Sequence, residues 1–131
     1  MIGLDTNIFI RLFVQDDSKQ LKDARQLISE KCSQDDPGHV SIIVLAELVW
    51  TLAKVYDFSR DDISFVLRSL IESKDLSIEH ENHVLSSLMI FDQSTSDFPD
   101  ILIGEINNAA GCETTMTFDK KASKLSSFTK I

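Results

Sequence analysis

The stretch MIGLDTNIFI, residues 1–10, contains the pattern that decides the fold. Its first part is apolar and suits a short strand, whereas Asp5, Thr6 and Asn7 are residue types that cap the start of a helix. Apolar side chains from Ile8 onward then recur at helical spacing. We therefore predict a strand that runs directly into a helix, with the carboxylate of Asp5 at the junction.

A short β-prone segment followed by a helical pattern recurs along the rest of the chain. Strands that alternate with helices favour right-handed βαβ units, and hence a parallel sheet covered by helices on both faces. The further elements that we predict are helices over residues 18–31, 44–55 and 81–91, a helix from Ser59, a helix that opens within residues 96–100 and runs through Ala110, a helical turn at Asp119, and strands over residues 40–43, 76–78, 114–118 and 128–131.

The composition suits one soluble domain. The chain has 131 residues, of which 43% are hydrophobic, enough for an ordinary core without disulfides or a structural metal. No repeat or linker is visible, so we predict a single domain over residues 1–131. Cys32 and Cys112 lack metal-ligand spacing and fit a reducing cytosol. With no basic leader and no run long enough for a membrane span, we expect an unprocessed cytoplasmic protein that makes no membrane contact.

The formal net charge of −8 argues against a general nucleic-acid binder, which normally presents a basic face. Carboxylates gathered around divalent cations would change this, because the cations invert the local field and let a polyanion approach. The tail after Gly111 also offers a local positive rim. Its charged residues are Lys120, Lys121, Lys124 and Lys130 against Glu113 and Asp119.

Four carboxylates are placed where the predicted strands end and helices begin. In parallel sheets, ligands bind outside the carboxyl ends of the strands. Carboxylates that converge there repel one another unless hard cations lie between them, and Mg²⁺ and Mn²⁺ prefer carboxylate and water oxygens. Such ions supply a nucleophilic water and stabilise charge on an attacked phosphate. The candidate metal ligands and catalytic residues are Asp5, Glu47, Asp100 and Asp119.

Each of these acids also has a structural explanation. Asp5 and Asp119 suit helix N-caps, and Asp97 forms a capping-box-like pair with Asp100. Glu47 is harder to explain in this way, because it lies in an apolar helical run where a buried carboxylate would need a cation or water.

Three other site types are less consistent with the sequence. His80 and His83 are three residues apart, but a solvated helix start accounts for them. A phosphatase with an aspartyl nucleophile at Asp5 would need a second aspartate two positions later, where Asn7 stands. A receiver domain would need an acidic pair near the first strand, and none is visible.

Three segments together resemble the PIN domain and are similar to VapC-type toxins of toxin–antitoxin modules. They are IGLDTNIFIR (residues 2–11), AELVW (residues 46–50) and SDFPDILIGEINNAAGCETTMTFDKK (residues 96–121). The resemblance implies a three-layer α/β/α sandwich with a central parallel sheet, and Mg²⁺- or Mn²⁺-dependent endoribonuclease activity on RNA. It also implies a homodimer and a cognate antitoxin protein as partner.

The same resemblance assigns roles to individual residues. It implies that the four acids named above hold the metal, with Asp97 as a near neighbour whose contribution stays open. Thr6, Asn7 and Thr117 match polar positions that orient metal ligands or water. Ile101 and Gly104 stand where alanine is common in the family. A PIN-like domain that binds metal or protein without cleaving RNA is the alternative function.

Overall fold

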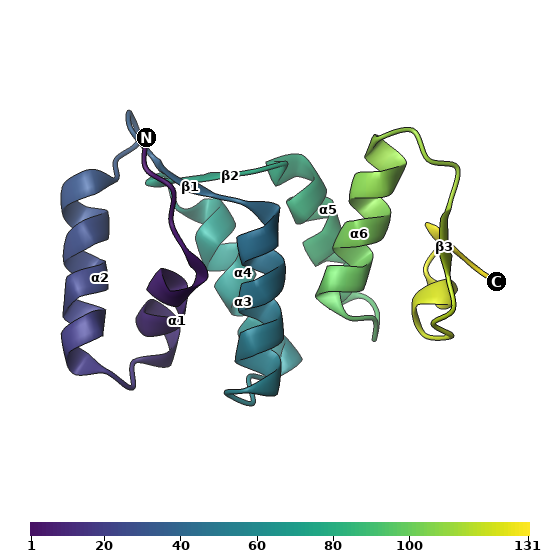
Figure 1. Ribbon diagram of the computed structural model, residues 1–131, viewed down its shortest axis with the longest axis horizontal. Coiled ribbons are helices and arrows are strands. Elements are labelled where there is room, and N and C mark those ends of the chain that lie inside the picture. The colour runs from purple at the N-terminus through teal and green to yellow at the C-terminus, as the bar shows by residue number, and fades with distance from the viewer. The chain divides into compact units, whose positions relative to one another are not determined.

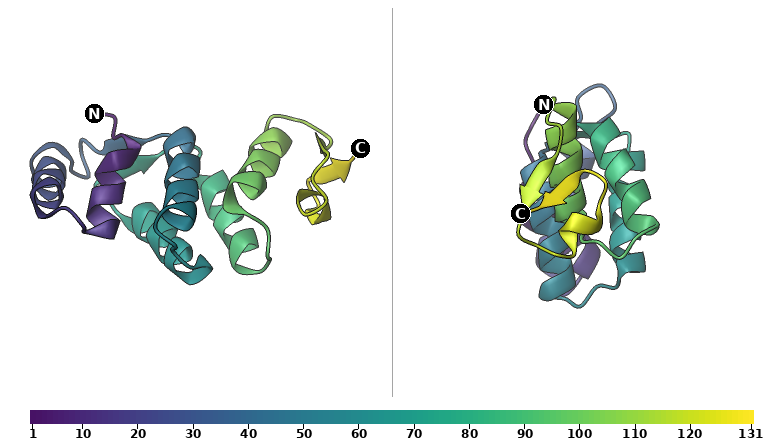
Figure 2. Two further views of the ribbon diagram at one scale, coloured as in Figure 1. Left: turned by 60° about the horizontal axis from the view of Figure 1, so that its bottom comes forward. Right: turned by 90° about the vertical axis from the view of Figure 1, so that its right-hand side faces the viewer.

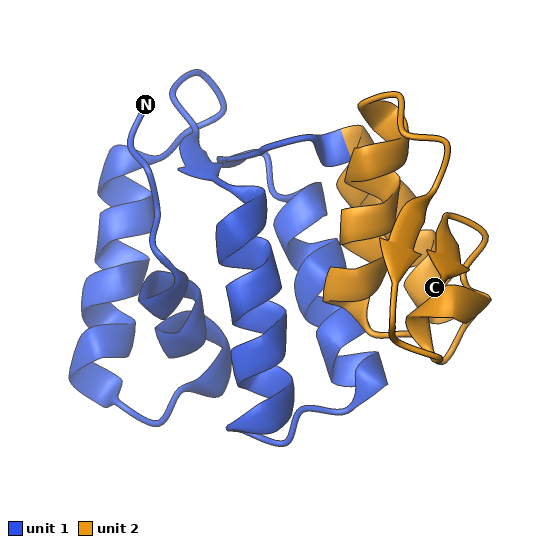
Figure 3. Cartoon of the chain, turned by 45° about the vertical axis from the view of Figure 1, so that its right-hand side comes forward, with its two compact units in different colours: residues 1–81 blue, residues 82–131 orange.

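Six α-helices and four short strands alternate along the chain in the computed structural model, which describes residues 1–131 throughout (Figures 1 and 2). They fall into two units, residues 1–81 and residues 82–131 (Figure 3). The first unit contains α1 (Thr6–Val14), α2 (Ser18–Lys31), β1 (Gly38–Val40), α3 (Ile42–Lys54), α4 (Arg60–Glu72) and β2 (Leu76–Ile78). Next come α5 (Glu81–Asp92), α6 (Phe98–Ala109), β3 (Thr115–Thr117), the short 3-10 helix η1 (Ala122–Lys124) and β4 (Phe128–Lys130).

Parallel backbone pairing organises the first unit. Strands β1 and β2 are parallel, with Val40 opposite Ile78. The N-terminal segment also runs parallel to β1 and joins it through a bridge between Gly3 and His39. The amide of Leu4 donates to the carbonyl of His39 at 2.9 Å. The predicted first strand is thus reduced to one bridge, and α1 follows it at once.

Helices α3 and α4 bury one face each in the core of this unit. Their buried side chains recur at spacings of three and four residues, as expected for helices that pack on one side. Full burial of such a side chain contributes roughly 1.5–3 kcal/mol. On α3 these residues are Leu45, Leu48, Val49 and Leu52, and on α4 they are Ile63, Val66, Leu67 and Leu70.

The predicted strand over residues 40–43 is wrong at its end, since β1 stops at Val40 and α3 begins at Ile42. The cause is Ser41, whose hydroxyl accepts a hydrogen bond from the amide of Val44 at 3.2 Å. A serine that caps in this way satisfies one of the free amides of the first helical turn and fixes where the helix starts. The β-branched run after it is therefore helical.

Parallel pairing also characterises the second unit, where β3 and β4 lie side by side near the C-terminus (Figure 2). Helix α6 packs very closely on the segment that leads into β4. A Cβ atom at Gly104 would collide with the hydroxyl of Ser127 and would lie 2.7 Å from Cε2 of Phe128. Glycine at this position therefore allows the helix to approach the strand. Gly111, with φ of +99°, follows the end of α6 as predicted.

These elements confirm the predicted α/β class. Every pairing of strands is parallel, and helices alternate with strands in a mixed α/β fold that agrees with the predicted α/β/α sandwich. The single domain stays a prediction. No helix is long and apolar enough to cross a membrane.

The two cysteines have different surroundings, and neither forms a disulfide. Cys32 is buried and Cys112 is exposed. Burial raises the pKa of the Cys32 thiol, and the negative charges of Asp75 and Asp36 raise it further. Cys32 therefore stays protonated more readily than a free thiol does.

Candidate functional site

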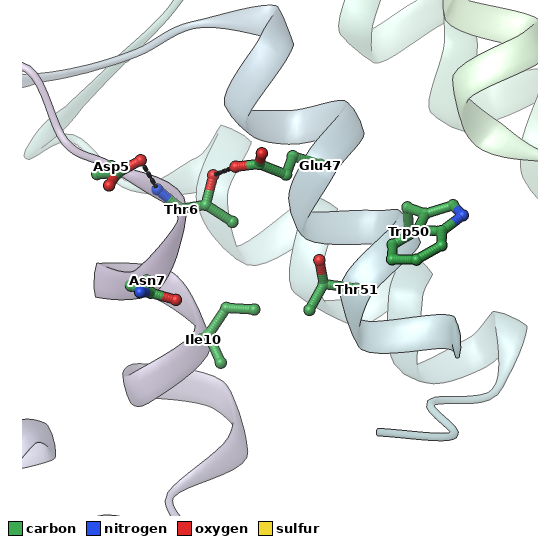
Figure 4. Close-up of a pocket in the computed structure, with 7 residues that line it drawn as sticks. All are labelled: Asp5, Thr6, Asn7, Ile10, Glu47, Trp50 and Thr51. Carbon is green, nitrogen blue, oxygen red and sulfur yellow. Dashed lines mark hydrogen bonds between the residues drawn. The ribbon is translucent and has the colours of Figure 1, made fainter. Parts of the chain in front are cut away.

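Asp5 and Glu47, the two predicted acids of the first unit, line the same pocket (Figure 4). The pocket has a volume of about 420 Å³ and lies between α1 and α3. Two of the predicted polar residues, Thr6 and Asn7, also belong to its wall. The complete lining is Asp5, Thr6, Asn7, Ile10, Glu47, Trp50 and Thr51.

Thr6 holds both acids of this pocket. Its backbone amide donates to Oδ1 of Asp5 at 2.8 Å, so Asp5 is the N-cap of α1. Its hydroxyl donates to Oε1 of Glu47 on α3, a short contact drawn in Figure 4. Thr6 is buried, whereas both acids are exposed. Asp5 can therefore cap α1 and line the pocket at the same time. One buried residue, Thr6, orients the carboxylates of both Asp5 and Glu47.

Glu47 differs from the sequence-based interpretation in its surroundings. We expected burial, because the residue lies within an apolar run, but the neighbouring Leu48 and Val49 occupy the buried face of α3 while Glu47 lies on the exposed one. Its charge therefore remains in contact with water, and no cation is needed to make the position tolerable. The reason to single out Glu47 is its link to Thr6.

In the second unit, Asp100 lies within the field of two other acids. Burial raises the pKa of Asp100, the charges of Asp97 and then Asp119 raise it further, and Lys121 opposes them. Asp100 stands in the first turn of α6 and is half-buried. A carboxylate whose ionisation is disfavoured by neighbouring carboxylates is one that a bound cation would relieve.

Asp119 is held at the end of β3 by local hydrogen bonds. Its Oδ1 accepts from the amide of Lys121 at 2.8 Å and from that of Ala122 at 3.5 Å, so it caps the turn that leads into η1. Its own amide donates to the hydroxyl of Thr117 at 3.0 Å. Thr117 thus positions the backbone of Asp119 rather than its carboxylate.

Asp97 does not form the capping box that we predicted. It occupies the N-cap position of α6, but its side chain makes no capping hydrogen bond. Its Oδ1 instead pairs with Nζ of Lys121 at 3.5 Å, and both side chains are largely exposed. Lys121 was missed as a partner, because a contact between residues so distant in sequence leaves no local pattern.

The candidate ligands are of the chemical type that binds a hard divalent cation. All four candidate ligands are carboxylates, which Mg²⁺ and Mn²⁺ prefer, and the perturbed carboxyl of Asp100 is of the type that such a cation stabilises. Within each unit, no three acids, histidines or cysteines lie close enough together to hold a metal ion.

Comparison with known proteins assigns the family. The model of the PIN domain matches residues 2–127, nearly the whole chain. The chain belongs to the PIN-domain family. PIN domains are generally nuclease domains and usually use divalent metals. Among curated proteins none matches the chain. Asp5, Glu47, Asp100 and Asp119 all lie within the part that matches the PIN domain.

Ile10, Trp50 and Thr51 also line the pocket, and none of them was predicted as a site residue. Trp50 ends the AELVW segment on α3, and 57% of its surface is exposed. Figure 4 shows its indole on the side of α3 away from α1, and no local pattern in the sequence marks it as a pocket residue.

Proposed function

We propose that this PIN domain is a metal-dependent endoribonuclease that hydrolyses phosphodiester bonds of RNA. The observation that carries the proposal is the pair Asp5 and Glu47, which share one pocket and are oriented by one buried residue, Thr6. Two oriented carboxylates in a chain of a generally nucleolytic family suit cation-assisted attack on phosphate better than they suit a purely structural role.

The proposed metal ligands are Asp5, Glu47, Asp100 and Asp119, with Mg²⁺ or Mn²⁺ as the cation. When bound, such a cation supplies an activated water and stabilises charge on the attacked phosphate. Thr6 keeps the Glu47 carboxylate directed toward α1, and Thr117 fixes the turn that carries Asp119. Outer residues of this kind set the orientation of ligands and therefore their affinity for the ion.

The tail lysines support an encounter with RNA despite the net charge of −8. Lys120, Lys121, Lys124 and Lys130 are all exposed. Lys121 already pairs with Asp97, so it limits repulsion among the acids of the second unit as well as offering a charge to phosphate. Affinity that comes from these lysines should fall as salt rises, because binding releases counterions from the RNA.

The biological role that we propose is the toxin of a toxin–antitoxin pair in the cytoplasm, acting as a homodimer and restrained by an antitoxin. The support is the likeness of the three sequence segments to VapC-type toxins. An antitoxin could block the acidic pocket by inserting an arginine or lysine, which forms strong hydrogen bonds with carboxylates. The second candidate is a PIN domain that binds metal or protein without cleavage, and the lack of three gathered ligands within either unit favours it.

One assay separates the two candidates. Purified protein, free of any co-purified inhibitor, is incubated with mixed RNA in Mg²⁺, in Mn²⁺ or in EDTA. We expect cleavage in either metal and none in EDTA. Asp5→Asn should lower the rate by about 10²-fold or more, which corresponds to roughly 3 kcal/mol of lost transition-state stabilisation. Asp35→Asn, an exposed acid of the loop before β1, is the matched control. Cleavage that persists in EDTA would refute the metal mechanism, and inactivity in both metals would favour the non-cleaving domain.

A further inference from the structure

The side chain of Asp97 departs from the role that its position suggests. An aspartate at an N-cap normally accepts a hydrogen bond from an amide of the first helical turn, but Asp97 at the start of α6 accepts none. Pro99 stands in that turn and has no amide hydrogen to donate. The Oδ1 atom of Asp97 lies instead 3.5 Å from Nζ of Lys121. Asp97 therefore pairs with a distant lysine and leaves the start of its own helix without a side-chain cap.

Lys121 is linked to each of the three acids of the second unit, Asp97, Asp100 and Asp119. Its ammonium pairs with Asp97, and its backbone amide donates to Oδ1 of Asp119 at 2.8 Å. Burial raises the pKa of Asp100, as do the charges of Asp97 and Asp119, and the positive charge of Lys121 opposes this rise. Lys121 is therefore the one basic residue that acts on all three acids.

The ion pair between Lys121 and Asp97 is only weakly held. The two side chains are 49% and 60% exposed, and ion pairs so open to water contribute little to stability. The three acids do not lie close enough together to hold a metal ion by themselves. The charge that they share is compensated here by the ammonium of a long, flexible side chain, which can leave at little cost.

The Lys121 ammonium and a divalent cation would compete for the same negative charge. Positive charges repel each other at short range, and two of the three acids, Asp100 and Asp119, are proposed metal ligands. A lysine suits an exchange of partners, because its compact charge on a flexible stem can turn to another acceptor. The phosphate oxygens of a bound RNA are acceptors of this kind.

We propose that Lys121 is the built-in counter-ion of Asp97, Asp100 and Asp119, that it leaves them when a divalent cation is bound, and that its ammonium then contacts a phosphate of the substrate. The inference rests on the proposed ribonuclease function and adds an order of events, with the cation first and the contact between lysine and phosphate second. It makes Asp97 the resting partner of Lys121 and not a metal ligand.

Metal affinity tests the competition without any measurement of cleavage. Mn²⁺ is titrated into the whole chain, and the free ion is measured by electron paramagnetic resonance. Lys121→Gln should lower the Kd for Mn²⁺ roughly two- to fivefold, the factor expected for the loss of one exposed charge contact. The gain should shrink at high salt, where exposed charges are screened. An unchanged or higher Kd would overturn the proposal.

Two variants control for charge and position. Lys121→Arg keeps the positive charge and should bind Mn²⁺ about as the wild type does. Lys120→Gln makes the same change of charge at the neighbouring exposed lysine and should change the Kd much less. Equal effects of Lys120→Gln and Lys121→Gln would mean that only the net charge matters, and the proposal would fail.

The departure of the ammonium can be followed by NMR. Reductive methylation with ¹³C-formaldehyde keeps the charge of each lysine and gives separate methyl signals, and the signal of Lys121 is the one that disappears in Lys121→Arg. We expect Mg²⁺ to move this signal toward the position of a solvated lysine and to leave the signal of Lys120 in place. A Lys121 signal that does not move at saturating Mg²⁺ would contradict the exchange.

RNA binding tests the second step. With Ca²⁺, which also takes oxygen ligands, Lys121→Gln should bind a short RNA more weakly than the wild type. The slope of log affinity against log salt should fall by roughly one, as for the loss of one phosphate contact. In EDTA the two proteins should bind RNA alike, because Asp97 still holds Lys121. Equal losses in both conditions would show that Lys121 meets RNA without leaving the acids.

The outcomes distinguish the inference from the function on which it rests. If the wild type cleaves RNA and Lys121→Gln keeps the Kd for Mn²⁺, the counter-ion role is wrong and the nuclease stands. If the Kd, the NMR signal and RNA binding change as expected but RNA is never cleaved, the exchange is supported and the nuclease is refuted.

Discussion

The hydroxyl of Thr6 donates a hydrogen bond to the carboxylate of Glu47, and this contact joins the first turn of α1 to the exposed side of α3. The same residue gives its amide to Asp5. Two acids that are far apart in the sequence therefore depend on one buried residue for their orientation, Asp5 on its amide and Glu47 on its hydroxyl.

Thr6→Val should disturb the orientation of the Glu47 carboxylate without disturbing the stability of the fold. Valine fills the same space without the hydroxyl, so the fold should persist while Glu47 loses its partner. We expect a fall in metal affinity or cleavage rate of about 10–100-fold, the usual effect of losing an outer hydrogen bond at a metal site. The measurement is the rate as a function of Mn²⁺ concentration, with circular dichroism to verify the fold. Thr6→Ser, which keeps the hydroxyl, should retain most of the activity; a loss as large as that of valine would contradict the role of the hydrogen bond.

The raised pKa of Asp100 predicts a stability that depends on pH. The folded state holds this proton more tightly than the unfolded chain, where the pKa of aspartate is about 3.9. The contribution of Asp100 to folding is therefore fully present below that value and is lost as pH rises through the raised pKa. Without metal, Asp100→Asn should melt at a higher temperature than wild type at neutral pH, and the difference should shrink as pH falls below the pKa. A variant that is less stable than wild type at neutral pH would contradict the prediction.

Asp97→Asn is the matched control for Asp100→Asn. The Asp97 side chain makes no capping hydrogen bond, and its exposed pair with Lys121 should contribute less than about 1 kcal/mol. Because the charge of Asp97 helps to raise the pKa of Asp100, the variant should also lower that pKa. Titration of the carboxyl carbons by NMR would measure this shift.

Metal should stabilise the folded protein through the same carboxylates. A ligand that binds only the folded state at a concentration of 100 times its Kd adds about 2.7 kcal/mol to the free energy of unfolding. We expect Mn²⁺ to raise the melting temperature of wild type and Asp100→Asn to reduce that rise. If Asp97→Asn abolishes the response and Asp100→Asn leaves it intact, Asp97 is the ligand of the pair.

Gly104→Ala should destabilise the second unit although alanine favours helices. The gain in helix propensity is about 1 kcal/mol, whereas overpacking against Ser127 and Phe128 typically costs 1–3 kcal/mol. We expect a lower midpoint in urea unfolding, and partial recovery when Ser127→Gly removes the nearest hydroxyl. Gly3→Ala is the control, since a Cβ there meets nothing within 4 Å. Equal effects of the two alanines would contradict the packing argument.

Local chemistry explains which parts of the fold the sequence could predict. Asp5 and Ser59 cap helices where their residue types indicate, and α2 and β2 have the predicted bounds. The predicted start of α3 was wrong because its β-branched residues also suit a strand. Only the capping hydrogen bond of Ser41 decides between helix and strand at this point.

Side-chain surroundings were harder to predict than the elements. Helix α3 is so rich in apolar residues that its pattern does not distinguish the exposed face from the buried one, and Glu47 was therefore wrongly expected to be buried. The pairing of Asp97 with Lys121 depends on the packing of distant segments. The four acids themselves follow from residue type and position, and their joint role as ligands stays a prediction.

The unequal thiols provide a natural labelling site. Cys112 lies in the open in the second unit, whereas Cys32 is buried with a raised pKa and should react slowly with maleimides. A dye attached through Cys112 would therefore mark the second unit alone, without any engineered residue. The emission of that dye, followed as cation and RNA are added, would report changes in the surroundings of the turn after α6.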